Sequence, residues 1–326
     1  MKRYRLAVLT SHPIQYQAPL WRKLARHSQI DLTVYFCSDY GVTYKFDPLF
    51  GLAYRWDIPL LDGYTYRFLK NYSAKPGLNS RWGLINLEIV RELWKHKYDA
   101  LFIHGHSYIT HLIAILAARF AGISVLFRSE ANLTNNFGKR RKFFKNILYR
   151  LIDGFMAIGT LNREYYSYYG VPSRKIFHMP YAVDNEWFFR QRDLYLSKRQ
   201  EMKREIGLRP ESKVILYVAK FIGRKRPLDL IKAFQRLSVP DVALVMVGDG
   251  IEREKCIEYV KKHKLKIDAK YYIESQLLPP LERVFESLNI NKSELMGVGR
   301  QKGIFDIIKS SVKKENLYEE LRRIFN

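Results

Sequence analysis

Four basic residues lie between an apolar run and a helix-like pattern in the segment "VAKFIGRKRPLDL". They are Lys220, Arg224, Lys225 and Arg226. Cationic side chains beside the free N–H groups at the start of a helix suit a diphosphate, because both groups attract its charge. A charge run can also be only a solvated surface. The position at a strand-to-helix junction favours a diphosphate site formed by Lys220, Arg224 and Lys225.

A glycine-containing turn, "VGDG", follows the next apolar run and holds Gly248 and Gly250. Glycine has no Cβ, so a backbone rich in it can approach a nucleotide closely. A Gly-x-Gly pair is a weak signal by itself. Its place after a strand leads us to predict a turn near the nucleotide.

Polar pairs follow three apolar runs in the first half of the chain: Ser11 and His12, His104 and His106, Arg128 and Glu130. A neutral imidazole can exchange hydrogen bonds with a sugar hydroxyl. Residues two apart on a strand share a face, so we expect each of the last two pairs to lie on one face. A helix-capping serine, a core histidine and a structural ion pair are the alternative explanations.

Neither a metal site nor a disulfide is indicated. Two histidines are too few ligands for zinc. Cys37 and Cys256 are far apart and belong to no Cys-x-x-Cys motif, which fits a reducing compartment. We expect no cofactor.

These residues need a scaffold that gathers the ends of strands. Apolar runs such as "RLAVLT", "DALFIHG" and "SVLFRSEAN" alternate with amphipathic helical patterns, which predicts an α/β fold with a parallel sheet covered on both faces. In such sheets ligands bind at the carboxyl ends of the strands. A polar stretch precedes a second, shorter series of two strands and two helices. We predict domains at 1–183 and 184–262 and a helical tail at 263–326, bent at Pro279–Pro280.

The chain of 326 residues has 56 Lys and Arg and 32 Asp and Glu, a net charge of +24, so anionic partners are expected. The segment from Lys261 to the end contributes only +5 of this charge. The segment 137–150 combines six cations and no acid with apolar residues, which suits either core packing or an anionic membrane surface. No signal peptide or membrane span is apparent. We therefore expect a cytoplasmic protein, with the inner face of the membrane as an alternative place.

Seven segments together resemble family 4 glycosyltransferases of the GT-B fold, over about residues 4–262: "SHPIQYQAPLWRKLA", "HGH", "FRSEAN", "AIGTLNREYYSYYGVP", "MPYAVDNEWF", "KFIGRKRPLDLIKAF" and "LVMVGDGIERE". The resemblance implies two facing Rossmann-like domains with a cleft, the front one for the acceptor and the back one for the donor. It implies transfer of a sugar from a nucleotide diphosphate sugar as co-substrate, with retention and without an essential metal.

The resemblance also implies roles for particular residues. His106 matches the histidine that faces the transferred sugar. Lys220 and Lys225 match the basic pair on the donor diphosphate, with Lys220 where arginine is more usual. Gly248 and Gly250 match the turn near the nucleotide.

The end of the chain departs from that family. Its paired-glutamate motif is not found, since Glu274 and Glu282 have the spacing but not the flanking residues. Residues from about 266 to 308 instead resemble the thumb end of archaeal family B DNA polymerases. "QKGIFDII" resembles their sliding-clamp-binding peptide, with isoleucines where aromatic residues are expected. The simplest account is two unrelated sequences joined near Lys264, with a truncated donor domain.

Three functions follow as hypotheses. The first is a glycosyltransferase that acts on a cell-envelope or lipid-linked acceptor. The second is an inactive remnant that binds a sugar or an acceptor, which the missing glutamate pair favours. The third is a clamp- or DNA-binding role of the tail, against which its small net charge argues.

Overall fold

The computed structural model describes residues 2–47, 52–56, 58–134 and 139–265, and the chain divides into two units, Met1–Arg192 and Asp193–Asn326. The tail motifs from the sequence, which include Pro279–Pro280, the glutamates at 274 and 282 and the clamp-like peptide, lie outside the described residues. Each unit is taken by itself below.

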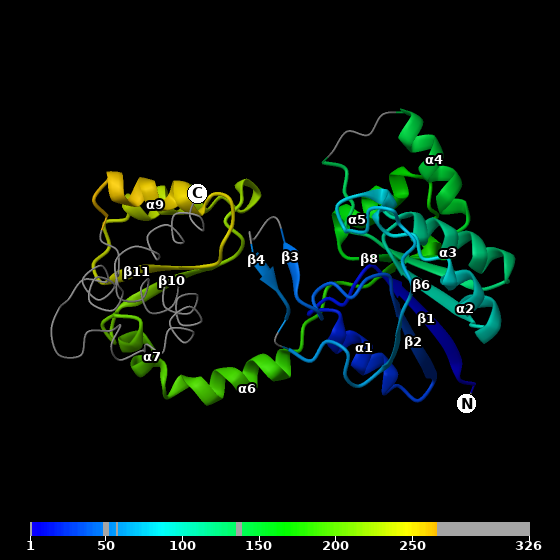
Figure 1. Ribbon diagram of the computed structural model, residues 1–326, viewed down its shortest axis with the longest axis horizontal. Coiled ribbons are helices and arrows are strands. Elements are labelled where there is room, and N and C mark those ends of the chain that lie inside the picture. The colour runs from blue at the N-terminus through cyan, green and yellow to red at the C-terminus, as the bar shows by residue number, and fades with distance from the viewer. Residues whose placement is uncertain (1, 48–51, 57, 135–138, 266–326) are drawn as a thin grey trace, which may run out of the picture. The chain divides into compact units, whose positions relative to one another are not determined.

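The first unit is built on a seven-stranded parallel sheet (Figure 1), which confirms the expected α/β fold. The strand order is β5-β2-β1-β6-β7-β8-β9. The strands are β1 (Tyr4–Thr10), β2 (Ile30–Phe36), β5 (Thr65–Phe68), β6 (Ala100–His104), β7 (Ser124–Arg128), β8 (Gly154–Ala157) and β9 (Ile176–His178). The central strands are apolar on both faces, as a sheet between two layers requires.

Helices cover both faces of this sheet. On one face, α1 (Ala18–Ala25) places Trp21 against Val8, Val34 and Phe102. The residues that pack on the other face come from four helices: α2 (Glu88–His96), α3 (Ile109–Phe120), α4 (Lys139–Arg150) and α5 (Thr160–Tyr168). The larger core lies on this second face.

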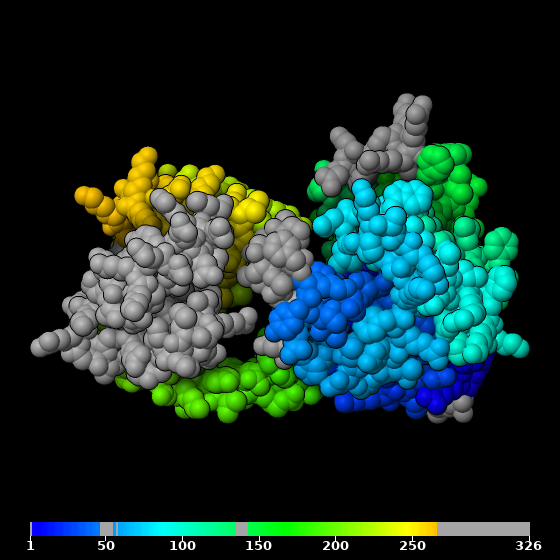
Figure 2. Space-filling view, viewed as in Figure 1, coloured from blue at the N-terminus to red at the C-terminus, as the bar shows by residue number. Residues whose placement is uncertain are grey.

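The segment between β2 and α2 has no counterpart in the expected pattern. It forms a short antiparallel hairpin, β3 (Lys45–Asp47) with β4 (Leu52–Tyr54), then the edge strand β5 and a 3₁₀ turn, η1 (Arg81–Gly83). In the space-filling view these residues, blue to cyan, cover much of the visible face of the unit (Figure 2). Leu60, Leu69 and Leu84 are buried there.

The described part of the second unit contains the two strands β10 (Lys213–Val218) and β11 (Val242–Val247), which pair in parallel. Its helical elements are α6 (Asn185–Leu196), which spans the boundary between the units, α7 (Arg199–Glu205), η3 (Gly223–Lys225), α8 (Pro227–Gln235) and α9 (Arg253–Lys262). Both strands and the helices α8 and α9 were expected from the sequence. Among the described residues, no helix is long and apolar enough to cross a membrane.

The apolar strands of the second unit are poorly covered. Leu216 and Val218 are 62% and 68% exposed, and the buried cluster is Phe221, Ile231 and Cys256. Buried apolar area is the main source of stability, so residues 193–265 should open more readily than the first unit.

Limited proteolysis is therefore expected to cleave within 193–265 at least about 10-fold faster than within the described part of unit 1. The measurement is digestion of the native full chain with thermolysin, followed by mass spectrometry of the fragments. Exposed loops of unit 1 serve as the internal reference. First cuts in the sheet region of unit 1 would contradict this expectation.

Candidate functional site

The carboxyl ends of three central strands bring the polar pairs of unit 1 together. β1 pairs with β6, and β6 pairs with β7. Ser11 and His12 follow β1, His104 ends β6, and Arg128 ends β7. Segments more than 110 residues apart in the chain thus meet at one edge of one sheet.

Ser11 and His12 form one hydrogen-bonded pair. The Ser11 hydroxyl lies 2.9 Å from His12 Nδ1, and the imidazole meets the ring of Tyr40 edge to face at 5.3 Å. Burial lowers the pKa of His12 to about 4, so its imidazole is neutral at pH 7. The Ser11 hydroxyl and the His12 imidazole are both uncharged and bonded to each other. Such a pair suits a hydrogen bond with a ligand hydroxyl better than the binding of a charged group.

His104 is fixed from the β1 side of the site. Its Nδ1 lies 3.0 Å from Nε2 of Gln17, and its ring packs on Trp21 and Phe102. Burial lowers the pKa of His104 to about 3, and the nearby charge of Arg128 lowers it further in the same direction. His104 therefore belongs to the core face that α1 covers.

His106 lies on the opposite face, so the expectation that the two histidines share a face is wrong. Gly105 between them has φ +80° and donates its N–H to the carbonyl of Arg128 at 2.7 Å. This left-handed turn ends the strand and breaks its alternation. The His106 ring packs on Phe127 and Tyr149, in the cluster beneath the four helices.

Several effects keep His106 neutral. Burial lowers its pKa to about 4, and the positive charges of Lys145 and Arg81 act in the same direction. A neutral imidazole can accept a proton or a hydrogen bond at pH 7, which an imidazolium cannot. Lys145, on α4, also donates to the hydroxyl of Tyr165.

Arg128 and Glu130 meet on the same tyrosine. The Arg128 guanidinium stacks over the ring of Tyr181 at 4.3 Å, and the Tyr181 hydroxyl donates to Glu130. Tyr16 packs edge to face on Tyr181 at 5.3 Å. No ion pair joins Arg128 to Glu130 among the described residues, so the structural ion pair considered from the sequence is not what holds them.

Sequence reasoning missed Gln17, Tyr16 and Tyr181 as parts of this site. Tyr16 and Gln17 lie within the segment "SHPIQYQAPLWRKLA". Of the three missed residues, Gln17 could have been found from the sequence, because it is a polar residue at the start of a helix. Tyr181 follows β9, at the far edge of the sheet, and only the fold brings it to Arg128.

In unit 2, two loops follow the two parallel strands and are bonded to each other. The N–H of Phe221 donates to the carbonyl of Asp249 at 2.8 Å, and the N–H of Glu252 donates to the carbonyl of Phe221 at 2.9 Å. The cationic segment 220–226 and the turn at Gly248 and Gly250 therefore form one surface at the carboxyl ends of β10 and β11.

The four cations of this surface are not equivalent. Arg226 has φ +51°, caps α8 and pairs with Asp229, Nε to Oδ2, at 2.6 Å. Arg224 and Lys225 are exposed, and no ion pair engages them among the described residues; Lys220 is half-buried. Arg224 and Lys225 are thus the cations with free charge at the beginning of a helix.

Gly248 has a structural reason to be glycine. A Cβ there would lie 2.0 Å from the carbonyl oxygen of Ala219, and φ is +145°. The glycine lets the two loops pack at backbone distance. Any approach to a nucleotide would add to that role.

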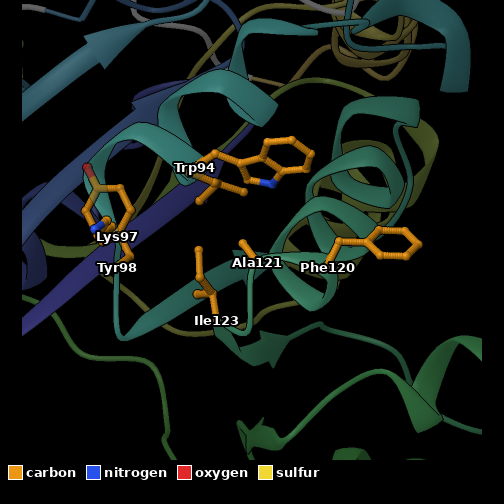
Figure 3. Close-up of a pocket in the computed structure, with 7 residues that line it drawn as sticks. Trp94, Lys97, Tyr98, Phe120, Ala121 and Ile123 are labelled. Atoms are coloured by element: carbon orange, nitrogen blue, oxygen red, sulfur yellow. The ribbon is translucent and has the colours of Figure 1, made fainter.

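A pocket of about 490 Å³ lies elsewhere in unit 1, between α2 and α3 (Figure 3). Tyr98 and Ile123, which line it, precede β6 and β7, so the pocket is at the amino ends of the strands. It is separate from the polar residues at the carboxyl ends. No group of three or more potential metal ligands occurs within the described ranges.

Comparisons with known proteins cover both units. Residues 198–278 match the family model of glycosyl transferases group 1, a stretch that runs past the junction inferred near Lys264. No curated protein matches the sequence.

Three solved structures are similar. HepE of Anabaena, in complex with UDP and glucose, has a TM-score of 0.56 at 12% identity, over 81% of this chain and 67% of that chain. A glycosyltransferase from Rickettsia africae has a TM-score of 0.56 at 14% identity, over 80% and 65%. The UDP-GlcNAc 2-epimerase from Neisseria meningitidis, bound to UDP-GlcNAc, has a TM-score of 0.50 at 21% identity, over 81% and 70%.

At these low identities, the structural similarity shows a common fold and no more. This chain spans about two thirds of the length of these proteins. Because the fold serves both transferases and an epimerase, the reaction has to be argued from the residues.

Proposed function

We propose that this chain transfers a sugar from a nucleotide diphosphate sugar to a hydroxyl of a cell-envelope or lipid-linked acceptor. Residues 1–183 serve the acceptor and residues 184–262 the donor. The observation that carries the proposal is the pair of bonded loops in unit 2, where Arg224 and Lys225 present free cations beside a glycine turn. The group 1 family match covers this same segment.

The donor site would act on the leaving group. Breaking the sugar–phosphate bond places developing negative charge on the diphosphate, and fixed cations stabilise that charge. Lys220, Arg224 and Lys225 supply the cations, and the N-terminus of α8 adds its N–H groups. We propose a retaining reaction without a metal.

The acceptor site would act through directional hydrogen-bonding groups. His106 offers an imidazole that stays uncharged at pH 7 to a sugar or acceptor hydroxyl, and Ser11, His12 and Glu130 offer further hydrogen-bonding groups. Hydroxyl recognition by such groups is directional and does not need net charge.

We also propose that α4 brings unit 1 to an anionic membrane surface on the cytoplasmic side. Its sequence carries six cations and no acid, and Phe143 and Phe144 are 64% and 69% exposed. Basic residues with exposed aromatic rings are typical of helices that bind lipid interfaces. A lipid-linked acceptor would be available there.

The test is a panel of sugar nucleotides with the purified full chain. We expect calorimetry to show binding of at least one nucleoside diphosphate, and chromatography to show its release from the matching sugar nucleotide. A transferase releases it faster with an acceptor present, whereas an epimerase-like reaction would be independent of acceptor. Binding without turnover would support the inactive-remnant hypothesis, and no binding across the panel would refute the proposed function.

A further inference from the structure

Arg128 is a buried cation, and two of its three side-chain nitrogens have no hydrogen-bond partner among the described residues. The residue is 3% exposed, and its Nε and one terminal nitrogen are buried without a hydrogen-bond partner in the described part of the chain. The ring of Tyr181, at 4.3 Å, provides the cation–π contact. An arginine does not lose its proton, so the charge remains. A buried donor without a partner destabilises the protein, because it has lost its hydrogen bonds to water.

A second unused donor lies on the neighbouring strand. His104 and Arg128 are register partners on β6 and β7, on the same face of the sheet. Gln17 accepts from the Thr10 hydroxyl through Oε1, which turns its Nε2 toward Nδ1 of His104. The proton of the neutral ring therefore sits on Nε2, which is buried and has no partner in the described residues.

Glu130 lies close enough for its charge to act on Arg128, but it leaves the buried donors of the guanidinium without a partner. Glu130 accepts from the hydroxyl of Tyr181, and no carboxylate of the described residues forms an ion pair with Arg128. The tyrosines that act on the guanidinium, Tyr16, Tyr166 and Tyr181, each have a raised pKa, chiefly from burial, and are neutral at pH 7. The cluster therefore has an excess of buried N–H donors.

We propose that Arg128 and His104 bind an oxyanion, a carboxylate or a phosphate, carried by the acceptor. The guanidinium and the imidazole N–H are a donor set that an anionic oxygen satisfies. Tyr181, 43% exposed and in a stretch without regular structure between β9 and α6, covers the guanidinium, and the oxyanion enters when this ring swings away. The assignment of the oxyanion to the acceptor rests on the proposed function, whereas the site itself follows from the buried donors of Arg128 and His104.

The first test is binding of small probes to the full chain, followed by NMR. Methyl glucuronide carries a carboxylate, glucose 6-phosphate carries a phosphate, and methyl glucoside is the neutral control. At least one anionic probe is expected to bind at least about 10-fold more tightly than the neutral one. The preferred probe tells a carboxylate from a phosphate, and equal binding of all three overturns the proposal.

Two variants and a matched control locate the site. Arg128→Met is expected to weaken binding of the anionic probe at least about 10-fold, and His104→Gln about 3-fold or more. Arg26→Gln removes an exposed charge of the same unit and is expected to change nothing. Unchanged binding by both site variants overturns the proposal.

The thermal midpoint separates a binding role from a structural one. Removal of an unpaired buried charge is often neutral or stabilising, so Arg128→Met is expected to have a Tm no lower than that of the parent. The anionic probe is expected to raise the Tm of the parent and not that of this variant. A large drop in Tm for Arg128→Met, with no effect of the probe on the parent, assigns Arg128 to structure and refutes the site.

Binding of UDP, measured in the same samples, keeps this inference apart from the proposed function. UDP binding without oxyanion binding refutes the oxyanion site alone. Oxyanion binding without binding of any nucleotide supports the site and refutes the proposed transfer.

Discussion

Replacing Lys225 by alanine is expected to lower release of the nucleoside diphosphate at least about 100-fold, the largest effect of any single change in unit 2. Lys225 is exposed, at the N-terminal side of α8, and no carboxylate of the described residues neutralises it. Loss of one group that stabilises transition-state charge costs about 10²–10³ in rate. Turnover is measured by chromatography, with the sugar nucleotide that the panel identifies.

The neighbouring Arg226 provides the matched control. It carries the same charge one position away, but Asp229 engages its guanidinium. Arg226→Asn keeps a residue type that tolerates its left-handed backbone and is expected to change turnover less than about 3-fold. Equal losses in both variants would mean that only net charge matters, and an active Lys225→Ala would refute the diphosphate role.

Acidification from pH 6.5 to 4.5 is expected to destabilise unit 1 strongly. Burial is the main cause of a lowered pKa in four histidines: about 4 in His12 and His106, and about 3 in His104 and His111. In the unfolded chain each titrates near 6.5. Between these values the unfolded state binds more protons, so stability falls as pH falls. Each histidine contributes up to about 1.4 kcal/mol per pH unit.

Calorimetry of the full chain at pH 7, 5.5 and 4.5 measures this effect. His111→Leu removes one of the four groups from a site that is 1% exposed, so its pH dependence should be shallower by about one proton. His178→Gln, at an exposed position on β9, is the control and should follow the parent. A parent protein with the same stability at pH 4.5 and 7 would contradict the buried, neutral state of these rings.

The sequence by itself determined the fold class and most of the segments that form its parallel strands. A continuous apolar run such as "RLAVLT" is typical of a strand that is buried between two layers of helices. The strands β1, β6, β7 and β10 were therefore predictable from the local pattern. The same logic placed the polar residues, because whatever follows a parallel strand lies at its carboxyl end. It missed β5 and α2, since both lie in the segment of the chain where the alternation is interrupted by the hairpin and η1.

The tertiary structure alone decided which of these residues meet and which way they face. The alternation of side chains along a strand predicted that His104 and His106 share a face. The left-handed backbone of Gly105 instead places them on opposite faces of the sheet. Tyr181 reaches Arg128 from the segment after β9, a strand two places from β7 in the sheet. Gln17 determines which nitrogen of His104, 87 residues later in the chain, carries the proton. Local pattern fixes where a strand ends, because that depends on neighbours in the chain. The partners, the burial and the charge state of these side chains depend on the order of the strands and on the backbone angle of Gly105. Only the folded sheet supplies both.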